Sequence, residues 1–214
     1  MKICCVIGPL AEDFPWDYST SSYTETYLED IKCAVEKFIS DGFDYFICNG
    51  AVGVGMDFAE TVLRFKKNYP HLKLEISIPY KNQEQRWSDE YKERYYSILE
   101  KADFVNTLSE YFKPDYMRNN DKYMINKSEF VYANFRQIRF EETYKSLQYA
   151  KTKKKKYMID DMGSILSFQE DLMYWECIEK AKAKLYPEIP FNRLKKEQLD
   201  GVCWYAKHLR KYKH

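Results

Sequence analysis

The chain has 214 residues, and 34 Lys and Arg against 33 Asp and Glu give a formal net charge of +1. This length is enough for one domain with a buried core and an appendage. The balanced charge does not favour nucleic acid as a partner, and no apolar run approaches the ~18 residues of a membrane span. The first residues lack a signal-peptide cleavage pattern, so we expect a cytoplasmic protein without membrane contact.

Short apolar segments alternate with amphipathic helical patterns along most of the chain. The first segment, Ile3–Ile7, is continuously apolar and stops at Gly8-Pro9, which is typical of a central strand buried on both faces. Strands are expected at 3–7, 44–48, 72–78, 103–108, 130–133 and 156–159. Helices are expected at 24–41, from near Asp57 to 67, and at 88–101, 115–127 and 141–151.

This alternation predicts βαβ units and therefore an α/β fold with a mostly parallel sheet. Right-handed crossovers place the loops that follow the strands on one rim of the sheet. We expect any ligand to bind at that rim, among the loops at 8–23, 49–57, 79–87, 109–119, 134–143 and 160–164.

The pattern changes after about residue 164. Two helices are expected at 165–186 and 193–212, because Pro187 and Pro190 interrupt the helical pattern between them. We therefore predict a sheet domain at 1–163 and a C-terminal helical hairpin at 164–214 that packs on it.

A glycine-rich turn, Gly50 to Gly55, joins the second strand to the next helix. Glycine permits positive φ and lets a ligand approach bare backbone, and a helix N-terminus attracts phosphate. The alternative is a tight strand-to-helix turn without a ligand, capped by the carboxylate of Asp57.

Cysteine and histidine spacing gives no sign of a metal site or a disulfide framework. The six cysteines contain no C-x-x-C pair, so we expect reduced structural thiols. None of the three histidines falls in a rim loop. The sequence therefore suggests no metal and no catalytic Ser-His-Asp or Cys-His set.

A series of short motifs occurs in a fixed order over residues 1–160. They are Phe46–Ala51, Asp57–Glu60, Ile78-Pro79-Tyr80 with Gln85 and Trp87, Arg94–Leu99, Ala102-Asp103, Arg118-Asn119, Tyr123–Asn126, and Ala133 with Thr143 and Tyr149-Ala150. This order resembles the YpsA-like branch of the SLOG superfamily, which takes its name from DNA-processing and Lonely-guy proteins. The resemblance implies a Rossmann-like sheet with helices on both faces, here with a C-terminal helical extension.

The resemblance also implies a site for a nucleotide or a nucleotide-derived small molecule. By match to its motifs, the ligand-binding residues are Gly8, Pro9, Gly50, Ala51, Gly53, Gly55, Asp57, Trp87, Arg118, Asn119 and Thr143. Arg118 would neutralise phosphate, although a surface pair with Asp115 or Asp121 explains it equally well. Asn120 is the alternative to Asn119, and Trp87 either stacks on a base or covers the end of the sheet.

One turn departs from the family pattern. Relatives have two glycines before the threonine, whereas this chain has Phe140-Glu141-Glu142-Thr143. Glu141 and Glu142 resemble, by position only, the acid that some Lonely-guy-type enzymes use to cleave an N-glycosidic bond. Because the P-G-G-x-G-T-x-x-E pattern is absent, we expect non-catalytic binding or sensing, with an N-glycosidic hydrolase as the alternative.

Two basic segments remain. The run Lys153–Lys156 is expected to be a solvated helix end. The last helix, from Trp204, is basic and aromatic, which leaves a DNA-associated role as a further alternative. The C-terminal helices are otherwise expected to relay ligand occupancy or to mediate self-assembly.

Overall fold

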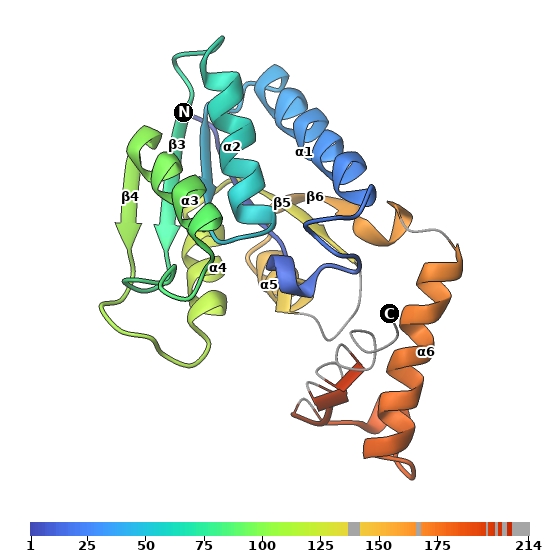
Figure 1. Ribbon diagram of the computed structural model, residues 1–214. Helices are drawn as coiled ribbons and strands as arrows, with labels where there is room; N and C mark the ends of the chain where they lie inside the picture. Colours follow the sequence, from blue (N-terminus) through green and yellow to red (C-terminus); the bar gives the residue numbers. More distant parts are fainter. Residues whose placement is uncertain (137–141, 166–167, 196, 200, 203–204, 207–214) are drawn as a thin grey trace.

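The computed structural model of the chain describes residues 1–136, 142–165, 168–195, 197–199, 201–202 and 205–206. Its centre is a six-stranded sheet in the order β4-β3-β2-β1-β5-β6 (Figure 1), in which every pairing is parallel. The strands are β1 (Ile3–Ile7), β2 (Tyr45–Cys48), β3 (Lys73–Ile78), β4 (Phe104–Thr107), β5 (Phe130–Phe135) and β6 (Lys156–Asp161). The predicted Rossmann-like α/β class is confirmed.

Helices cover both faces of this sheet (Figure 1). One face carries α1 (Tyr23–Ser40), α2 (Val54–Lys66) and α3 (Asp89–Lys101), and the other carries α4 (Tyr116–Lys127) and α5 (Glu142–Thr152). In β1, Cys4 and Val6 join the first apolar cluster while Cys5 and Ile7 join the second. Successive side chains point to opposite faces, so a central strand needs the continuous apolar run that the sequence shows.

Helix α2 begins earlier than the sequence pattern predicts. Its first residue is Val54 and its N-cap is Gly53, with φ 115°. Asp57 lies one turn inside the helix, where its own N–H donates to Gly53 O at 3.1 Å. The expected start near Asp57 is therefore wrong, and the alternative in which its carboxylate caps the helix does not hold either. The helix begins earlier because the positive φ of Gly53 already turns the chain into it.

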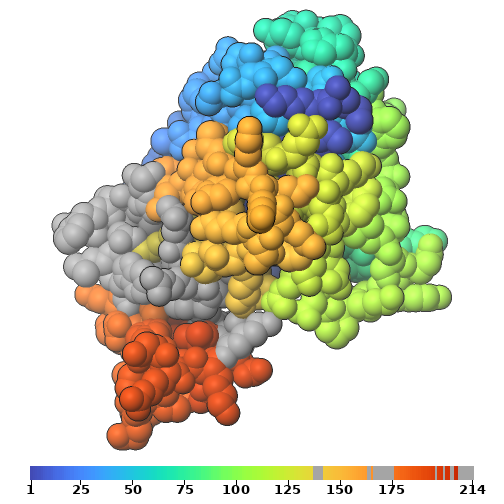
Figure 2. Space-filling view, turned by 180° about the vertical axis from the view of Figure 1, so that it is seen from behind, coloured from blue at the N-terminus to red at the C-terminus, as the bar shows by residue number. Residues whose placement is uncertain are grey.

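The C-terminal segment contains α6 (Phe168–Leu185) and a short 3₁₀ turn, η3 (Phe191–Arg193). Its described apolar side chains form a cluster of their own, around Ile178, Ala181 and Val202. Figure 2 shows the described tail residues, in orange-red, as a group of their own at the lower left of the view. The C-terminal helical extension is thus present, while the boundary at 163/164 stays a prediction.

The sequence predicts a second C-terminal helix at 193–212 and no membrane span in the chain. Of the predicted helix at 193–212, residues 197–199, 201–202 and 205–206 are helical, and most of the rest lies outside the described residues. Within the described part of the chain, no helix combines the length and apolarity needed to cross a bilayer.

Candidate functional site

A pocket of about 820 Å³ opens at the carboxyl rim of the sheet. Its lining comes from residues 10–12, 51–52, 80–91 and 112–117, which follow β1, β2, β3 and β4 in turn. Ligand sites in proteins typically have volumes of about 300–1,000 Å³. Four of the six rim loops named from the sequence therefore meet around one space of small-molecule size.

Aromatic rings form much of the pocket wall. Trp87 lies edge-on to Tyr95, with ring centroids 5.2 Å apart and an angle of 77°. On the other side, Tyr116 packs against Tyr80 at 4.9 Å and against Phe112 at 5.0 Å. These mutual contacts hold the rings in place, so that they offer flat apolar surfaces with polar edges.

Polar groups at the pocket are mostly uncharged. The buried Gln83 donates from Nε2 to Tyr95 Oη at 3.2 Å and to Asn49 O at 3.4 Å. Among the described lining residues, Arg86 is the one cation and Glu12 the one anion. The first residues of α3 and α4 also border the pocket, and helix N-termini carry partial positive charge.

The glycine turn is packed against protein atoms. A Cβ on Gly53 would lie 2.7 Å from Pro9 O and 2.7 Å from Ala11 N, and one on Gly55 would lie 1.8 Å from Asn49 Oδ1. Val54 N donates to Pro9 O at 3.4 Å, and the residues Val54–Ala59 are all buried. The first loop thus covers the N-terminus of α2, and close packing within the protein accounts for both glycines.

The other predicted residues around this turn divide between packing and pocket. Gly8 contacts Val54, since a Cβ there would lie 2.5 Å from its side chain. Gly50 has φ 64° and adjoins Ile76 and Tyr95. Only Ala51, with its neighbour Val52, reaches the pocket lining.

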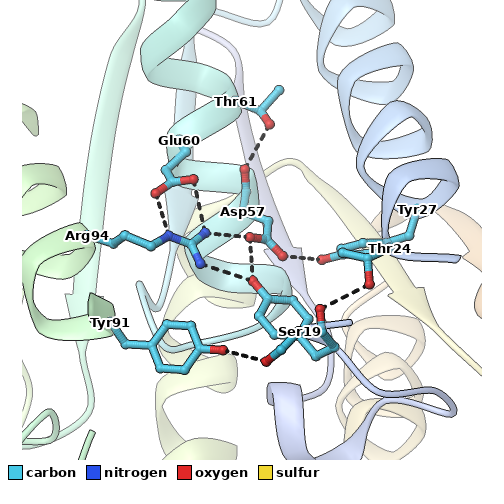
Figure 3. Close-up of polar contacts among 9 residues, drawn as sticks. Ser19, Thr24, Tyr27, Asp57, Glu60, Thr61, Tyr91 and Arg94 are labelled. Carbon is cyan, nitrogen blue, oxygen red and sulfur yellow. Dashed lines mark hydrogen bonds and ion pairs between the residues drawn. The ribbon is translucent and has the colours of Figure 1, made fainter. Parts of the chain in front are cut away.

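The carboxylate of Asp57 is buried in a network that joins four segments (Figure 3). It accepts hydrogen bonds from Tyr18 Oη at 2.7 Å, Tyr27 Oη at 3.1 Å and Arg94 Nη2 at 2.9 Å. Burial raises the pKa of Asp57, while the bonds from Tyr18 and Arg94 oppose that shift. Arg94 also binds Glu60 through two nitrogens.

The network around Asp57 contacts the pocket lining where Ser19 meets Tyr91. Ser19 Oγ lies 3.2 Å from Tyr91 Oη, and the ring of Tyr91 lines the pocket. Asp57 itself does not line the pocket. In this structure its carboxylate holds the first loop, α1 and α3 to α2.

The predicted residues on α4 and α5 form a second group. Arg118 Nη2 binds Glu142 Oε2 at 2.7 Å, and Arg118 Nη1 lies 3.5 Å from Asp115. Glu142 also binds Lys145 at 2.6 Å. Burial alone would raise the pKa of Glu142. The hydrogen bonds from Lys145 and Arg118 outweigh burial, so the pKa lies below its ordinary value. Glu141 lies outside the described residues.

The neighbours of Arg118 point in different directions. Asn119 is exposed, whereas Asn120 is buried and donates from Nδ2 to Ser77 O at 2.8 Å. Asn120 thereby fastens α4 to β3. Met117, which precedes Arg118, lines the pocket, so the α4–α5 group begins one residue beyond the pocket wall.

The sequence suggests Asp121 only as an alternative surface partner of Arg118, whereas the structure buries this acid. Asp121 accepts a hydrogen bond from Ser146 Oγ at 2.6 Å and lies on the helix that carries Arg118. Burial raises its pKa to about 7, against the opposing effect of Ser146. The buried Thr143 lies three residues before Ser146 on α5. The available signal for its burial was its helical face, because Asp121 lies three and four residues before the buried Met124 and Ile125.

Metal ligands do not gather anywhere in the described residues, where no cluster of three or more His, Cys, Asp or Glu could hold an ion. Four of the described cysteines, Cys4, Cys5, Cys48 and Cys177, are buried free thiols, and Cys33 is an exposed one.

The parallel sheet in this strand order defines a Rossmann-like α/β protein, and its rim carries a pocket of small-molecule size with aromatic walls. The family model described as YpsA, a SLOG family, matches residues 21–172. The chain therefore belongs to the YpsA family of SLOG proteins. Membership of this family suggests a nucleotide-related function.

Curated relatives carry only a family label. A UPF0398 protein of Brevibacillus brevis is 35% identical over 103 residues, which span 47% of this chain and 55% of that protein. A UPF0398 protein of Halalkalibacterium halodurans is 30% identical over 135 residues, spanning 60% and 69%. One of Bacillus pumilus is 31% identical over 139 residues, spanning 62% and 73%. The chain thus matches little more than half of the Brevibacillus relative.

Proposed function

We propose that the protein binds a nucleotide-derived small molecule in the rim pocket and senses it without turnover. The observation that carries this proposal is the pocket itself, with aromatic rings on its walls and the N-termini of two helices at its border. Membership of the YpsA family agrees with a ligand of this class.

The parts of such a ligand suit different parts of the pocket. A nucleobase would stack on Trp87 or Tyr91, since an aromatic ring accepts the face of any base. The amides of Gln83 and Gln85 would then hydrogen-bond to polar edges of the base. A phosphate or other anionic group would lie toward Arg86 and the first turn of α3.

Glu142, the acid that the sequence suggests as a candidate, does not line the pocket and is paired with cations, which favours binding over cleavage. N-glycosidic hydrolysis needs a carboxyl group that can donate a proton to the leaving group. Glu142, the described candidate for that role, is paired with Arg118 and Lys145, which lower its pKa. It is therefore ionised at neutral pH and poorly suited to act as the acid.

The test is calorimetric titration of the full chain with AMP, NAD and ADP-ribose, followed by chromatography of the mixtures. We expect one or more of these ligands to bind and to be recovered intact. Trp87→Ala should weaken binding by about 5- to 150-fold, because stacking on one base contributes about 1–3 kcal/mol. Tyr69→Ala, which removes a ring from outside the pocket lining, is the matched control and should bind normally.

Three results would overturn the proposal. The first is the absence of binding for the whole panel, and the second is binding that Trp87→Ala leaves unchanged. The third is release of free base that Glu142→Gln abolishes, which would establish the hydrolase instead.

A further inference from the structure

The edge strand β4 is unusually apolar and exposed. Within the described residues β4 pairs with β3 alone, so its outer backbone groups face solvent. Five of the eleven large apolar side chains that are exposed in the described chain come from residues 104–112. They are Phe104 (50% exposed), Val105 (47%), Leu108 (36%), Tyr111 (77%) and Phe112 (62%).

This edge is short, but it lacks the charged side chains and prolines that natural proteins use to keep edge strands from pairing between molecules. The segment Phe104–Leu108 contains no charged residue and no proline. The acid that precedes it, Asp103, is neutralised by Lys66 and Lys73. The opposite edge, β6, differs: it follows a lysine run and contains Lys156, Asp160 and Asp161.

We propose that β4 is a dimerisation edge, along which a second copy of this chain adds its own β4 antiparallel to the first. A two-fold axis brings each side chain close to its counterpart, so a charge on the axis would repel itself and an uncharged strand is self-complementary. With the axis at Asn106, Phe104 lies opposite Leu108 and Val105 opposite Thr107. This register pairs the whole uncharged segment, and both sheets continue into one.

The dimer edge adjoins the pocket through the loop after β4. Leu108 leads into the segment that carries Phe112, and Phe112 both belongs to the exposed stretch and lines the pocket. A second copy would therefore brace the outer wall of the site. The inference does not depend on which ligand binds there.

Sedimentation equilibrium of the full chain at micromolar concentrations tests the proposal. We expect twice the 25.8 kDa of one chain. Val105→Lys should shift the mass to that of the monomer, because it places charges near the axis. Leu28→Lys, a matched change of an exposed apolar residue on α1, should remain dimeric. Circular dichroism should show that both variants are folded.

Disulfide cross-linking provides a second test, which detects the dimer directly and does not require a variant that weakens it. Residues opposite each other in antiparallel strands have Cα atoms about 4.5–5.5 Å apart, within disulfide range. In a Cys33→Ser background, Asn106→Cys should form a covalent dimer on oxidation, and Leu28→Cys should not. A wild-type monomer, a dimer that survives Val105→Lys, or a dimer that Asn106→Cys does not cross-link would overturn the proposal.

Discussion

Gly55 has the least space of any glycine described, and replacing it with alanine tests why the turn needs it. Gly55 is helical and its φ is not positive, so alanine suits its backbone. The difficulty is Asn49, whose Oδ1 would lie 1.8 Å from the new Cβ. Gly55→Ala must therefore move the side chain of Asn49.

The cost follows from what Asn49 holds. Its Oδ1 accepts the N–H of Ala51 at 3.0 Å, and this bond is buried. Leaving such a donor unpaired costs about 1–3 kcal/mol, and alanine offsets up to about 1 kcal/mol through its helix propensity. We expect Gly55→Ala to lower the free energy of unfolding by about 1–2 kcal/mol, which for a chain of this size lowers Tm by about 3–6 °C.

A double-mutant cycle measured by urea and thermal unfolding isolates this mechanism. Asn49→Ala alone should destabilise the protein, and Gly55→Ala should then cost nothing further, since the clashing group is gone. Gly42→Ala is the control: its Cβ meets open space but its φ is +83°, so it should lose about 1 kcal/mol from the backbone alone. Additive costs for Asn49→Ala and Gly55→Ala, or a fully stable Gly55→Ala, would refute this reasoning.

The remaining predictions concern two buried carboxylates. Arg94→Met should lower the free energy of unfolding by about 3 kcal/mol, because removing one partner of a buried ion pair leaves the other charge uncompensated. Adding Asp57→Asn should restore part of the loss in urea unfolding, and a further loss would contradict the ion-pair explanation. Asp121 has a pKa near 7 in the folded protein and near 3.9 when unfolded, so the native state holds its proton more tightly. The stabilisation that protonated Asp121 adds to the free energy of unfolding is therefore complete below about pH 4. It is lost as the pH rises through about 7. The difference in stability between wild type and Asp121→Asn should fall over that range in thermal melts, and a constant difference would show that Asp121 does not titrate there.

The fold was largely predictable because each strand is short, apolar and bounded by clear breakers. Ile3–Ile7 was located to the residue, and β4 differs from its prediction by one residue at each end. The start of α2 was misplaced because an acidic residue, Asp57, looks like a cap. The true start depends on the φ of Gly53, which the sequence does not specify.

The candidate site was only partly predictable, for a physical reason. Ala51 and Trp87, which were named from the family motifs, line the pocket. The position of the rim itself followed from the alternation of strands and helices. The partners of Asp57 could not be found, since Tyr18 and Arg94 lie 39 and 37 residues away from it. Asn120 was distinguishable from Asn119 in principle, because it shares a helical face with the buried Met124.

The carboxylate of Asp57 also has a consequence for how the N-terminal half unfolds. The segment between β1 and α1 has the length of a loop that would ordinarily open by itself, yet Tyr18 ties it to α2 and α3. Opening the loop alone would strip a buried charge of one of its three donors. Amide hydrogens in this segment should therefore exchange together with those of α2, as one cooperative unit, instead of at the rate of a free loop.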